Sequence, residues 1–305
     1  MTDLYTGAGG AHAVQRGYRE LLDAWPVPAE RLRVPTGQGE TFVLACGPPQ
    51  APPVLLLHGS GTNSAMWAGE VADWARHFRL YAVDMIGEPG LSAPSRPSLA
   101  SGAYADWLDD VLAGLGVRDP HLVGVSLGGW LALEHATRRP GRTGALALLC
   151  PGGIGRQRYA VLVAALLLMP FGRWGRRTTM GLVLGPGAAP GPAPTPEEAA
   201  RERAFGEHAM LIHEHFRPRR EKLPVFTDEA LRGLRRPLMV TVGGRDALLD
   251  SHDTARRLRE TVPHATVRLL PEAGHLIRDQ RRPILEFLLS ARQDGTATDP
   301  EAASR

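Results

Sequence analysis

The chain has 305 residues, of which 43% are hydrophobic and 22% are charged, and its formal net charge is +3. This composition predicts a globular protein with a substantial core, and its scattered arginines exclude the basic stripe of a nucleic-acid interface. Two cysteines, Cys46 and Cys150, are too few for a disulfide framework and indicate a reducing compartment. Because the first residues lack the pattern of a secretory signal, we expect a cytoplasmic protein.

The first half of the chain changes from a helix to alternating strands and helices. Apolar residues at helical spacing predict a helix over residues 11–25, and residues 30–47 predict two strands around a turn. The apolar run at 52–57 is typical of a strand buried on both faces. Beyond it we expect helices at 64–78, 104–116 and 127–139 and strands at 79–87, 121–125 and 144–150.

The last third of the chain resumes this alternation. Strands are predicted at 237–244 and 265–270, and helices at 251–262 and 281–292. Repeated strand–helix–strand units require a mostly parallel sheet with helices on both faces, so the fold class is α/β. We assign residues 1–150 and 237–292 to this core.

Residues 151–236 interrupt the alternation, and we interpret them as an inserted helical cap or lid. Within the cap, residues 185–196 are rich in proline and glycine and predict a mobile loop. The apolar run Val161–Met169 is too short to span a membrane, which excludes stable membrane insertion. Residues 293–305 predict a disordered tail.

A serine lies between two glycines at the end of a predicted buried strand. Gly124, Ser126 and Gly128 form a G-x-S-x-G pattern where the following helix is predicted to begin. A tight turn of this kind projects the serine hydroxyl at the edge of the sheet, beside the free N–H groups of a helix N-terminus. The pattern predicts a nucleophile elbow with Ser126 as the nucleophile.

A serine hydroxyl needs a general base, which a buried carboxylate must orient. In proteins with this elbow the partners follow in the order serine, acid, histidine, each after a later strand. Asp246 follows the predicted strand at 237–244, and His275 follows the strand at 265–270. We therefore predict Asp246 as the acid and His275 as the base.

Three other aspartates compete with Asp246 for the acid role. We expect Asp250 to lie at the start of the helix at 251–262, Asp253 to lie within that helix, and Asp84 to support a loop after an early strand. These positions favour structural roles for all three.

Two backbone N–H groups must stabilise the negative oxygen of the acyl intermediate. One is predicted from Leu127, directly after the nucleophile. The other is predicted from Ser60, with Gly61 as the alternative, in the loop that follows the strand at 52–57. We expect His58 to shape this loop rather than to transfer protons.

Histidines also cluster in the predicted cap. His208, His213, Glu214 and His215 lie close in sequence, but their spacing does not match the H-E-x-x-H pattern of a helical zinc site. We therefore predict no metal.

With these motifs in place, the sequence resembles the α/β-hydrolase superfamily from about Arg31 to Leu289. Four stretches carry the resemblance: HGSGTNSAMW, DMIGEPGLS, GVSLGGW and AGH. Within the superfamily the chain is most similar to bacterial carboxylesterases of the naproxen-ester-hydrolysing type, which share the FTDEALRGL-like stretch before the acid strand. The resemblance implies the α/β-hydrolase fold, a helical cap over the active site, and no cofactor.

The motifs together predict a serine hydrolase that cleaves a carboxylic ester, or a related acyl compound, through an acyl-enzyme. The apolar cap suggests a small-molecule substrate with a hydrophobic group, with this set of pocket residues: Val161, Leu162, Met169 and Met180. An apolar cap can also be buried against a second subunit, so a homodimer stays an open alternative.

Three alternatives remain open from the sequence. The fold also supports non-hydrolytic biosynthetic enzymes such as cyclases, lyases or dehydratases, and it supports ligand receptors. The HGSG stretch also resembles the corresponding stretch of C–C bond hydrolases. Those enzymes usually carry Asn before the nucleophile and Met after it, where this chain has Val125 and Leu127.

Overall fold

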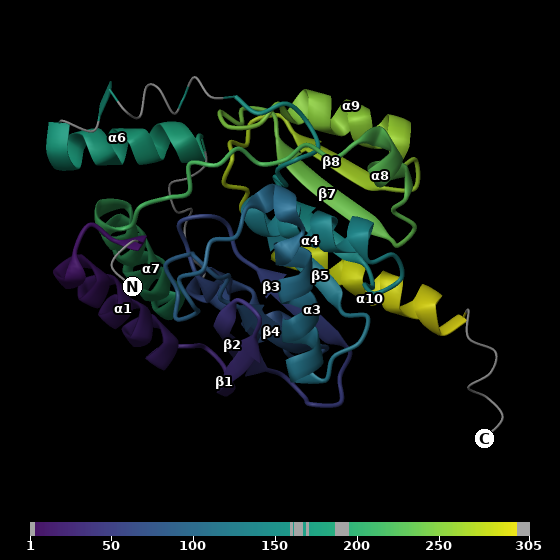
Figure 1. Ribbon diagram of the computed structural model, residues 1–305, viewed down its shortest axis with the longest axis horizontal. Coiled ribbons are helices and arrows are strands. Elements are labelled where there is room, and N and C mark those ends of the chain that lie inside the picture. The colour runs from purple at the N-terminus through teal and green to yellow at the C-terminus, as the bar shows by residue number, and fades with distance from the viewer. Residues whose placement is uncertain (1–3, 159–160, 162–166, 169–170, 187–194, 298–305) are drawn as a thin grey trace.

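The computed structural model describes residues 4–158, 161, 167–168, 171–186 and 195–297. Within them the chain builds one eight-stranded sheet, in which β2 is antiparallel to both of its neighbours, β1 and β4, and all other neighbouring strands are parallel (Figure 1). From one edge to the other the strands are β1 (Ala29–Thr36), β2 (Gly39–Cys46), β4 (Arg79–Val83), β3 (Pro53–Leu57), β5 (His121–Val125), β6 (Leu146–Leu149), β7 (Leu238–Gly243) and β8 (Thr266–Leu270). The predicted α/β class with a mostly parallel sheet is confirmed.

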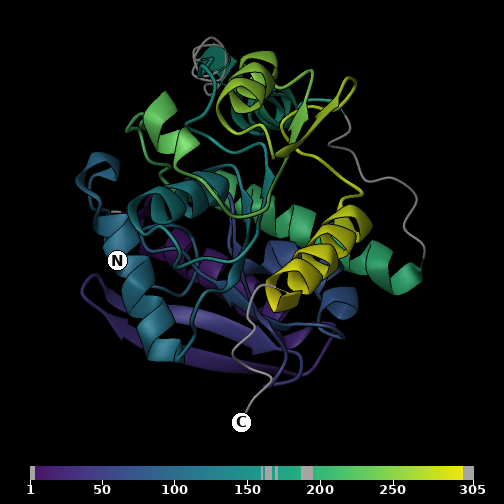
Figure 2. The ribbon, with the colours of Figure 1, turned by 90° about the vertical axis from the view of Figure 1, so that its right-hand side faces the viewer.

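Helices cover both faces of this sheet (Figure 2). One face packs against α3 (Ala103–Leu115), α4 (Leu127–Arg138), α8 (Asp228–Arg232) and α9 (Ser251–Thr261). The other packs against α1 (Ala8–Asp23), the 3₁₀ helix η2 (Ser64–Gly69), α2 (Val71–Trp74) and α10 (Arg281–Ala297). A short 3₁₀ helix, η3 (Leu99–Ser101), precedes α3.

Strand β3 shows how the sequence builds this two-sided core. Leu55 and Leu57 pack into the cluster under α3 and α4, whereas Val54 and Leu56 pack into the cluster under α1 and α10. Side chains alternate between the two faces of a strand, so a continuous apolar run is needed when both faces are covered. All four side chains are fully buried.

Two predicted segments differ from the structure. The helix expected at 64–78 is replaced by η2 and the single turn α2, because Asn63 caps a 3₁₀ turn and the chain bends again after Gly69. The disordered tail predicted from residue 293 is wrong for residues 293–297, because α10 continues to Ala297. Residues 298–305 lie outside the described residues.

The inserted region contributes α6 (Gly172–Leu184) and α7 (Pro196–His215). Helix α7 packs against α1 and η2, whereas α6 lies apart from them in Figure 1. Ile154 at the start of the region, and Phe226 and Leu231 at its end, belong to the core cluster under α4. Both ends of the insertion are thus built into the core, while the boundaries 151–236 stay a prediction.

Among the described helices, none combines the length and the hydropathy needed to cross a membrane. The predicted mobile loop at 185–196 falls mostly on residues 187–194, which lie outside the described residues.

Candidate active site

Ser126 occupies the sharp turn between β5 and α4. Its backbone has φ 52° and ψ −108°, a strained conformation for a residue with a side chain. The flanking glycines make the turn feasible: a Cβ atom on Gly124 would lie 2.6 Å from Gly128 O, and one on Gly128 would lie 2.6 Å from His58 O. The G-x-S-x-G pattern therefore reflects close backbone packing on both sides of the serine, which stays partly accessible.

The structure brings together the three residues that the sequence analysis selected. His275 Nε2 lies 3.0 Å from Ser126 Oγ, and His275 Nδ1 lies 2.7 Å from Asp246 Oδ2. His275 follows β8 and Asp246 follows β7, so the parallel strands bring both loops to the edge where β5 ends. This chain of contacts gives the serine hydroxyl a proton acceptor and gives the imidazole a carboxylate that orients it.

The carboxylate of Asp246 is buried and ionised. It is 1% exposed, and its second oxygen accepts hydrogen bonds from Leu248 N at 2.7 Å and Leu249 N at 3.0 Å. Burial alone would raise the pKa of Asp246, but the hydrogen bonds from His275, Leu248 and Leu249 outweigh it and lower the pKa. The negative charge therefore remains available to stabilise a protonated His275.

The loop after β3 lies next to the elbow. A Cβ atom added to Gly59 would lie 3.8 Å from Ser126 Cβ. His58 is fully buried and holds this loop: its Nδ1–H donates to Gly59 O at 2.8 Å, and its Nε2 accepts Met85 N–H at 2.9 Å. Burial lowers the pKa of His58, so the neutral ring bridges the two loops, consistent with the shaping role expected for it.

The two candidates for the second oxyanion donor differ in whether the backbone N–H already donates a hydrogen bond. Gly61 N–H donates to Glu88 Oε2 at 2.7 Å, so it already has an acceptor. Ser60 binds the same oxygen through its side chain, with Ser60 Oγ at 3.2 Å. This arrangement favours the N–H of Ser60 over that of Gly61, while Leu127 begins α4 directly after the nucleophile.

The other aspartates have structural partners. Asp84 is fully buried and accepts hydrogen bonds from Tyr18 Oη at 2.7 Å, from Ser64 N at 3.0 Å and from Leu91 N at 2.8 Å. It therefore ties α1, η2 and the loop after β4 together, as expected of a supporting carboxylate.

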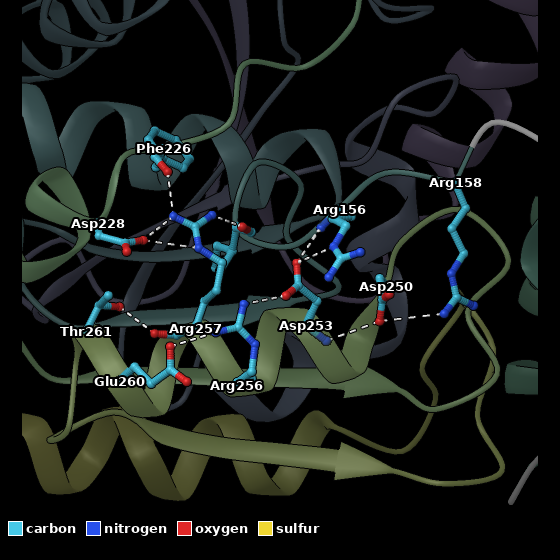
Figure 3. Close-up of polar contacts among 11 residues, drawn as sticks. Arg156, Arg158, Phe226, Asp228, Asp250, Asp253, Arg256, Arg257, Glu260 and Thr261 are labelled. Atoms are coloured by element: carbon cyan, nitrogen blue, oxygen red, sulfur yellow. Dashed lines mark hydrogen bonds and ion pairs between the residues drawn. The ribbon is translucent and has the colours of Figure 1, made fainter.

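Asp250 and Asp253 organise the start of α9, as Figure 3 shows. Asp250 caps the helix by accepting Asp253 N–H at 3.1 Å, and Asp253 Oδ2 accepts Arg156 N–H at 3.0 Å. Farther along α9, Arg257 donates to Ile154 O and to Phe226 O. The two ends of the insertion are thereby tied to one helix.

The insertion also contacts the loops that carry the acid and the histidine. On the acid side, Arg158 N–H donates to Leu248 O at 2.7 Å. On the histidine side, Leu276 N–H donates to Leu184 O at 3.1 Å, and Gly274 N–H donates to Pro186 O at 3.2 Å. Residues 184–186, at the end of α6, therefore run beside His275.

Cys150, directly after β6, is a buried neighbour of the site. Its sulfur and one ligand atom each of Asp246 and His275 lie within 4.8 Å of one another. Burial, followed by the charge of Asp246, raises the pKa of Cys150 well above its usual value, so the thiol stays protonated. Because a thiol is a poor metal ligand and His275 Nδ1 already binds Asp246, the cluster does not favour a metal site.

The histidine cluster of α7 includes one buried member. His208 is 2% exposed, stacks on Tyr18, and contacts Asn63 Nδ2 through its Nε2 at 3.0 Å. Burial lowers the pKa of His208 to about 4. A neutral ring that packs α7 against the core explains this histidine without a metal.

The predicted pocket residues are only partly described. Val161 and Met180 are half-buried, whereas Leu162 and Met169 lie outside the described residues. Nearby, Leu167, Phe171 and Trp174 are exposed by 69%, 62% and 63%. The insertion thus presents large apolar side chains on its surface as well as toward its interior.

The fold and the geometry of the site agree with the comparisons with known proteins. A model of the alpha/beta hydrolase family matches residues 54–287, and the chain belongs to that family.

The most informative relatives are carboxylesterases of Bacillus subtilis. Carboxylesterase nap of strain 168 is 31% identical over 268 residues, which are 85% of this chain and 85% of the relative. The crystal structure of carboxylesterase CesB (YbfK) is 28% identical, with a TM-score of 0.78 over 94% of this chain and 100% of that chain. That of naproxen esterase is 29% identical, with a TM-score of 0.76 over 90% and 95%. The predicted resemblance is confirmed, and the chain is a carboxylesterase-like hydrolase by similarity.

Proposed function

We propose that the protein is a serine esterase that cleaves a carboxylic ester through an acyl-enzyme. The observation that carries this proposal is the continuous chain from Ser126 Oγ through His275 to Asp246, with contacts of 3.0 and 2.7 Å. The similarity to carboxylesterases over most of the chain supports an ester as the substrate.

The first half of the reaction forms the acyl-enzyme. Ser126 Oγ attacks the ester carbonyl carbon while His275 Nε2 takes the hydroxyl proton, and Asp246 stabilises the resulting imidazolium. The carbonyl oxygen becomes an oxyanion, which the N–H groups of Ser60 and Leu127 stabilise. The intermediate then collapses, the C–O bond to the alcohol breaks, and His275 returns the proton to the departing alkoxide.

The second half releases the acid. A water molecule attacks the acyl carbon and gives its proton to His275, and the same two N–H groups stabilise the second oxyanion. The Ser126 ester bond breaks, and the proton returns to Ser126 Oγ. No step requires a metal or a cofactor to balance atoms or charge.

The substrate class follows from the composition of the insertion. The sequence of the insertion carries the apolar run Val161–Met169, and Val161 and Met180 are half-buried. We propose that these apolar side chains accommodate a hydrophobic acyl or alcohol group. Each buried CH₂ contributes about 0.8 kcal/mol, so kcat/KM should rise about fourfold for each added methylene until the pocket is filled.

The test is hydrolysis of p-nitrophenyl esters, from acetate to long acyl chains, by the wild type and by Ser126→Ala. We expect the variant to lose a factor of about 10⁴ to 10⁶ in kcat with an unchanged melting temperature. Ser290→Ala is a matched control, because Ser290 lies exposed on α10, where its hydroxyl donates to Phe287 O. Retained turnover in Ser126→Ala, or no turnover of any ester by the wild type, would contradict the proposal.

A further inference from the structure

Glu88 is a buried carboxylate beside the oxyanion loop, and the mechanism above gives it no role. It follows β4 and is 3% exposed. Its Oε2 accepts two hydrogen bonds from consecutive residues of the loop, one from Gly61 N–H at 2.7 Å and one from Ser60 Oγ–H at 3.2 Å. A single carboxylate oxygen therefore fixes both the side chain of Ser60 and the peptide that follows it.

The peptide that precedes Ser60 is fixed independently. Gly59 O and the N–H of Ser60 belong to the same planar peptide unit, so the direction of the carbonyl sets the opposite direction of the N–H. His58 Nδ1–H donates to Gly59 O at 2.8 Å and thereby orients this unit. With His58 on one side and Glu88 on the other, both peptides around Ser60 are held.

We propose that Glu88 is a positioning residue that aims the Ser60 N–H at the oxyanion, by binding Ser60 Oγ and Gly61 N–H. This inference rests on the proposed function, because it assigns Glu88 to the same oxyanion site. Glu88 acts through Ser60 and touches no reacting atom.

The surroundings of Glu88 connect the oxyanion loop to the end of the insertion. The charged and titratable groups that face it are Arg96 from its own loop, Arg219 from the segment after α7, Tyr104 from α3 and Tyr5 from the N-terminal segment. Arg219 donates to Tyr104 Oη at 2.6 Å, and Arg96 donates to Arg217 O at 2.8 Å. The carboxylate that binds the loop thus also lies in the electrostatic field of two arginines that hold the chain leaving α7.

Burial raises the pKa of Glu88 to about 7, although Gly61 N–H, Arg96 and Ser60 act to lower it. The ionised carboxylate is the stronger acceptor for both loop hydrogen bonds. Below this pKa, protonation of Glu88 should therefore weaken the hydrogen bonds that hold the loop.

The first experiment compares Glu88→Ala and Glu88→Gln in the hydrolysis of p-nitrophenyl butyrate. We expect Glu88→Ala to lower kcat on the order of 10- to 100-fold with KM nearly unchanged. A misdirected Ser60 N–H stabilises the oxyanion of the transition state less, but it changes the binding of the substrate little. Glu88→Gln should recover most of the activity, since its amide oxygen accepts the same two hydrogen bonds.

Glu70 supplies the matched control. Burial also raises the pKa of Glu70 to about 7, but it lies at the start of α2 and its charged neighbours are Arg278, Arg281 and Glu202. We expect Glu70→Ala to keep wild-type kcat. Equal losses in Glu70→Ala and Glu88→Ala, or a Glu88→Gln as inactive as Glu88→Ala, would overturn the inference.

The pH dependence of kcat provides a readout that does not depend on the alanine variant folding. Above the pKa of Glu88, which is about 7, the ionised carboxylate is a stronger acceptor than the glutamine amide, so the wild type should have the higher kcat. Below that pKa the protonated carboxyl is neutral like the amide, and the ratio of the wild-type kcat to the Glu88→Gln kcat should fall toward one. A kcat ratio that does not change with pH would overturn the inference.

The outcomes separate this inference from the function on which it rests. Ser126-dependent turnover by the wild type, together with unaffected Glu88 variants, overturns the positioning role alone. A wild type without Ser126-dependent turnover overturns the esterase and the positioning role together.

Discussion

The α/β core buries tryptophan side chains in close contacts, whereas an inserted helix leaves one exposed. Trp130 in α4 is fully buried, stacks on Phe226 and donates its N–H to Pro224 O at 3.1 Å. Trp174 in α6 is 63% exposed, and its ring contacts Phe171, which is 62% exposed. The core is fixed by many simultaneous contacts, whereas α6 keeps large apolar groups on the surface.

This difference separates the part of the molecule that holds the proposed catalytic groups from the insertion that contacts them. The proposed catalytic groups lie on loops that leave the packed sheet, where the backbone around Ser126 tolerates no extra atom at Gly124 or Gly128. The insertion reaches these loops through a few backbone hydrogen bonds, such as Leu276 N–H to Leu184 O. Under the proposed function, the core therefore holds the catalytic groups, and the insertion contacts the loops that carry two of them.

The largest expected difference compares a core residue and an insertion residue at the acid loop. Asp246→Asn should lower kcat by about 10⁴, because the His275 ring loses the anion that orients it. Arg158 donates to the backbone oxygen of Asp246 at 3.3 Å and pairs with Asp250 at 3.5 Å from an exposed position. Arg158→Gln should cost less than about fivefold. Esterase kinetics check both, and a larger loss in Arg158→Gln would break the comparison.

The second prediction concerns stability. Trp130→Ala should lower the free energy of unfolding by about 3 to 5 kcal/mol, because a large buried side chain is removed from a filled core. Trp174→Ala should change it by less than about 0.5 kcal/mol. Urea unfolding of the two variants measures the contrast, and similar losses would show that α6 is packed as tightly as α4.

The third prediction follows from the raised pKa of Glu88, which is about 7 in the folded protein against an ordinary value of 4.5. Between these values the folded state binds more protons than the unfolded state, so this group makes the protein less stable as pH rises from 4.5 to about 7. Glu88→Gln should therefore gain stability relative to the wild type on going from pH 5 to pH 8. Denaturant unfolding at the two pH values tests this, and a constant difference would contradict the pKa.

The smallest expected effect contrasts two glycines. A Cβ atom on Gly206, an exposed residue of α7, would meet no atom within 4 Å. Gly206→Ala should raise the free energy of unfolding by about 0.5 to 1 kcal/mol, since alanine is the better helix former. Gly128→Ala is the opposite case, because its Cβ would lie 2.6 Å from His58 O. Thermal unfolding should shift upward in the first variant and downward in the second, and shifts of the same sign would refute the contrast.

The sequence predicts the core well because its signals are local. The apolar run of β3, the strand–glycine–serine turn before α4, and the order of Ser126, Asp246 and His275 each follow from periodicity or spacing. The sheet then brings distant residues together without further information, because parallel strands end at the same edge.

The sequence predicts less where function depends on which loops meet. In the sequence, Glu88 is one acidic residue in a loop. Only the fold brings its carboxylate to within hydrogen-bond distance of Ser60 and Gly61. Likewise, nothing in the sequence around His208 indicates that its ring packs on Tyr18 of α1. Pocket residues in the insertion were predicted from apolarity alone, which does not distinguish a side chain that faces a substrate from an exposed one such as Trp174.

The most direct test of the central claim is covalent capture of the nucleophile. Diethyl p-nitrophenyl phosphate should react with the wild type to leave a single diethylphosphoryl adduct on the peptide that contains Ser126, as read by mass spectrometry, and His275→Ala should react far more slowly. An adduct on another residue, or labelling of Ser126→Ala at the wild-type rate, would contradict the assignment of Ser126, His275 and Asp246 as one catalytic unit.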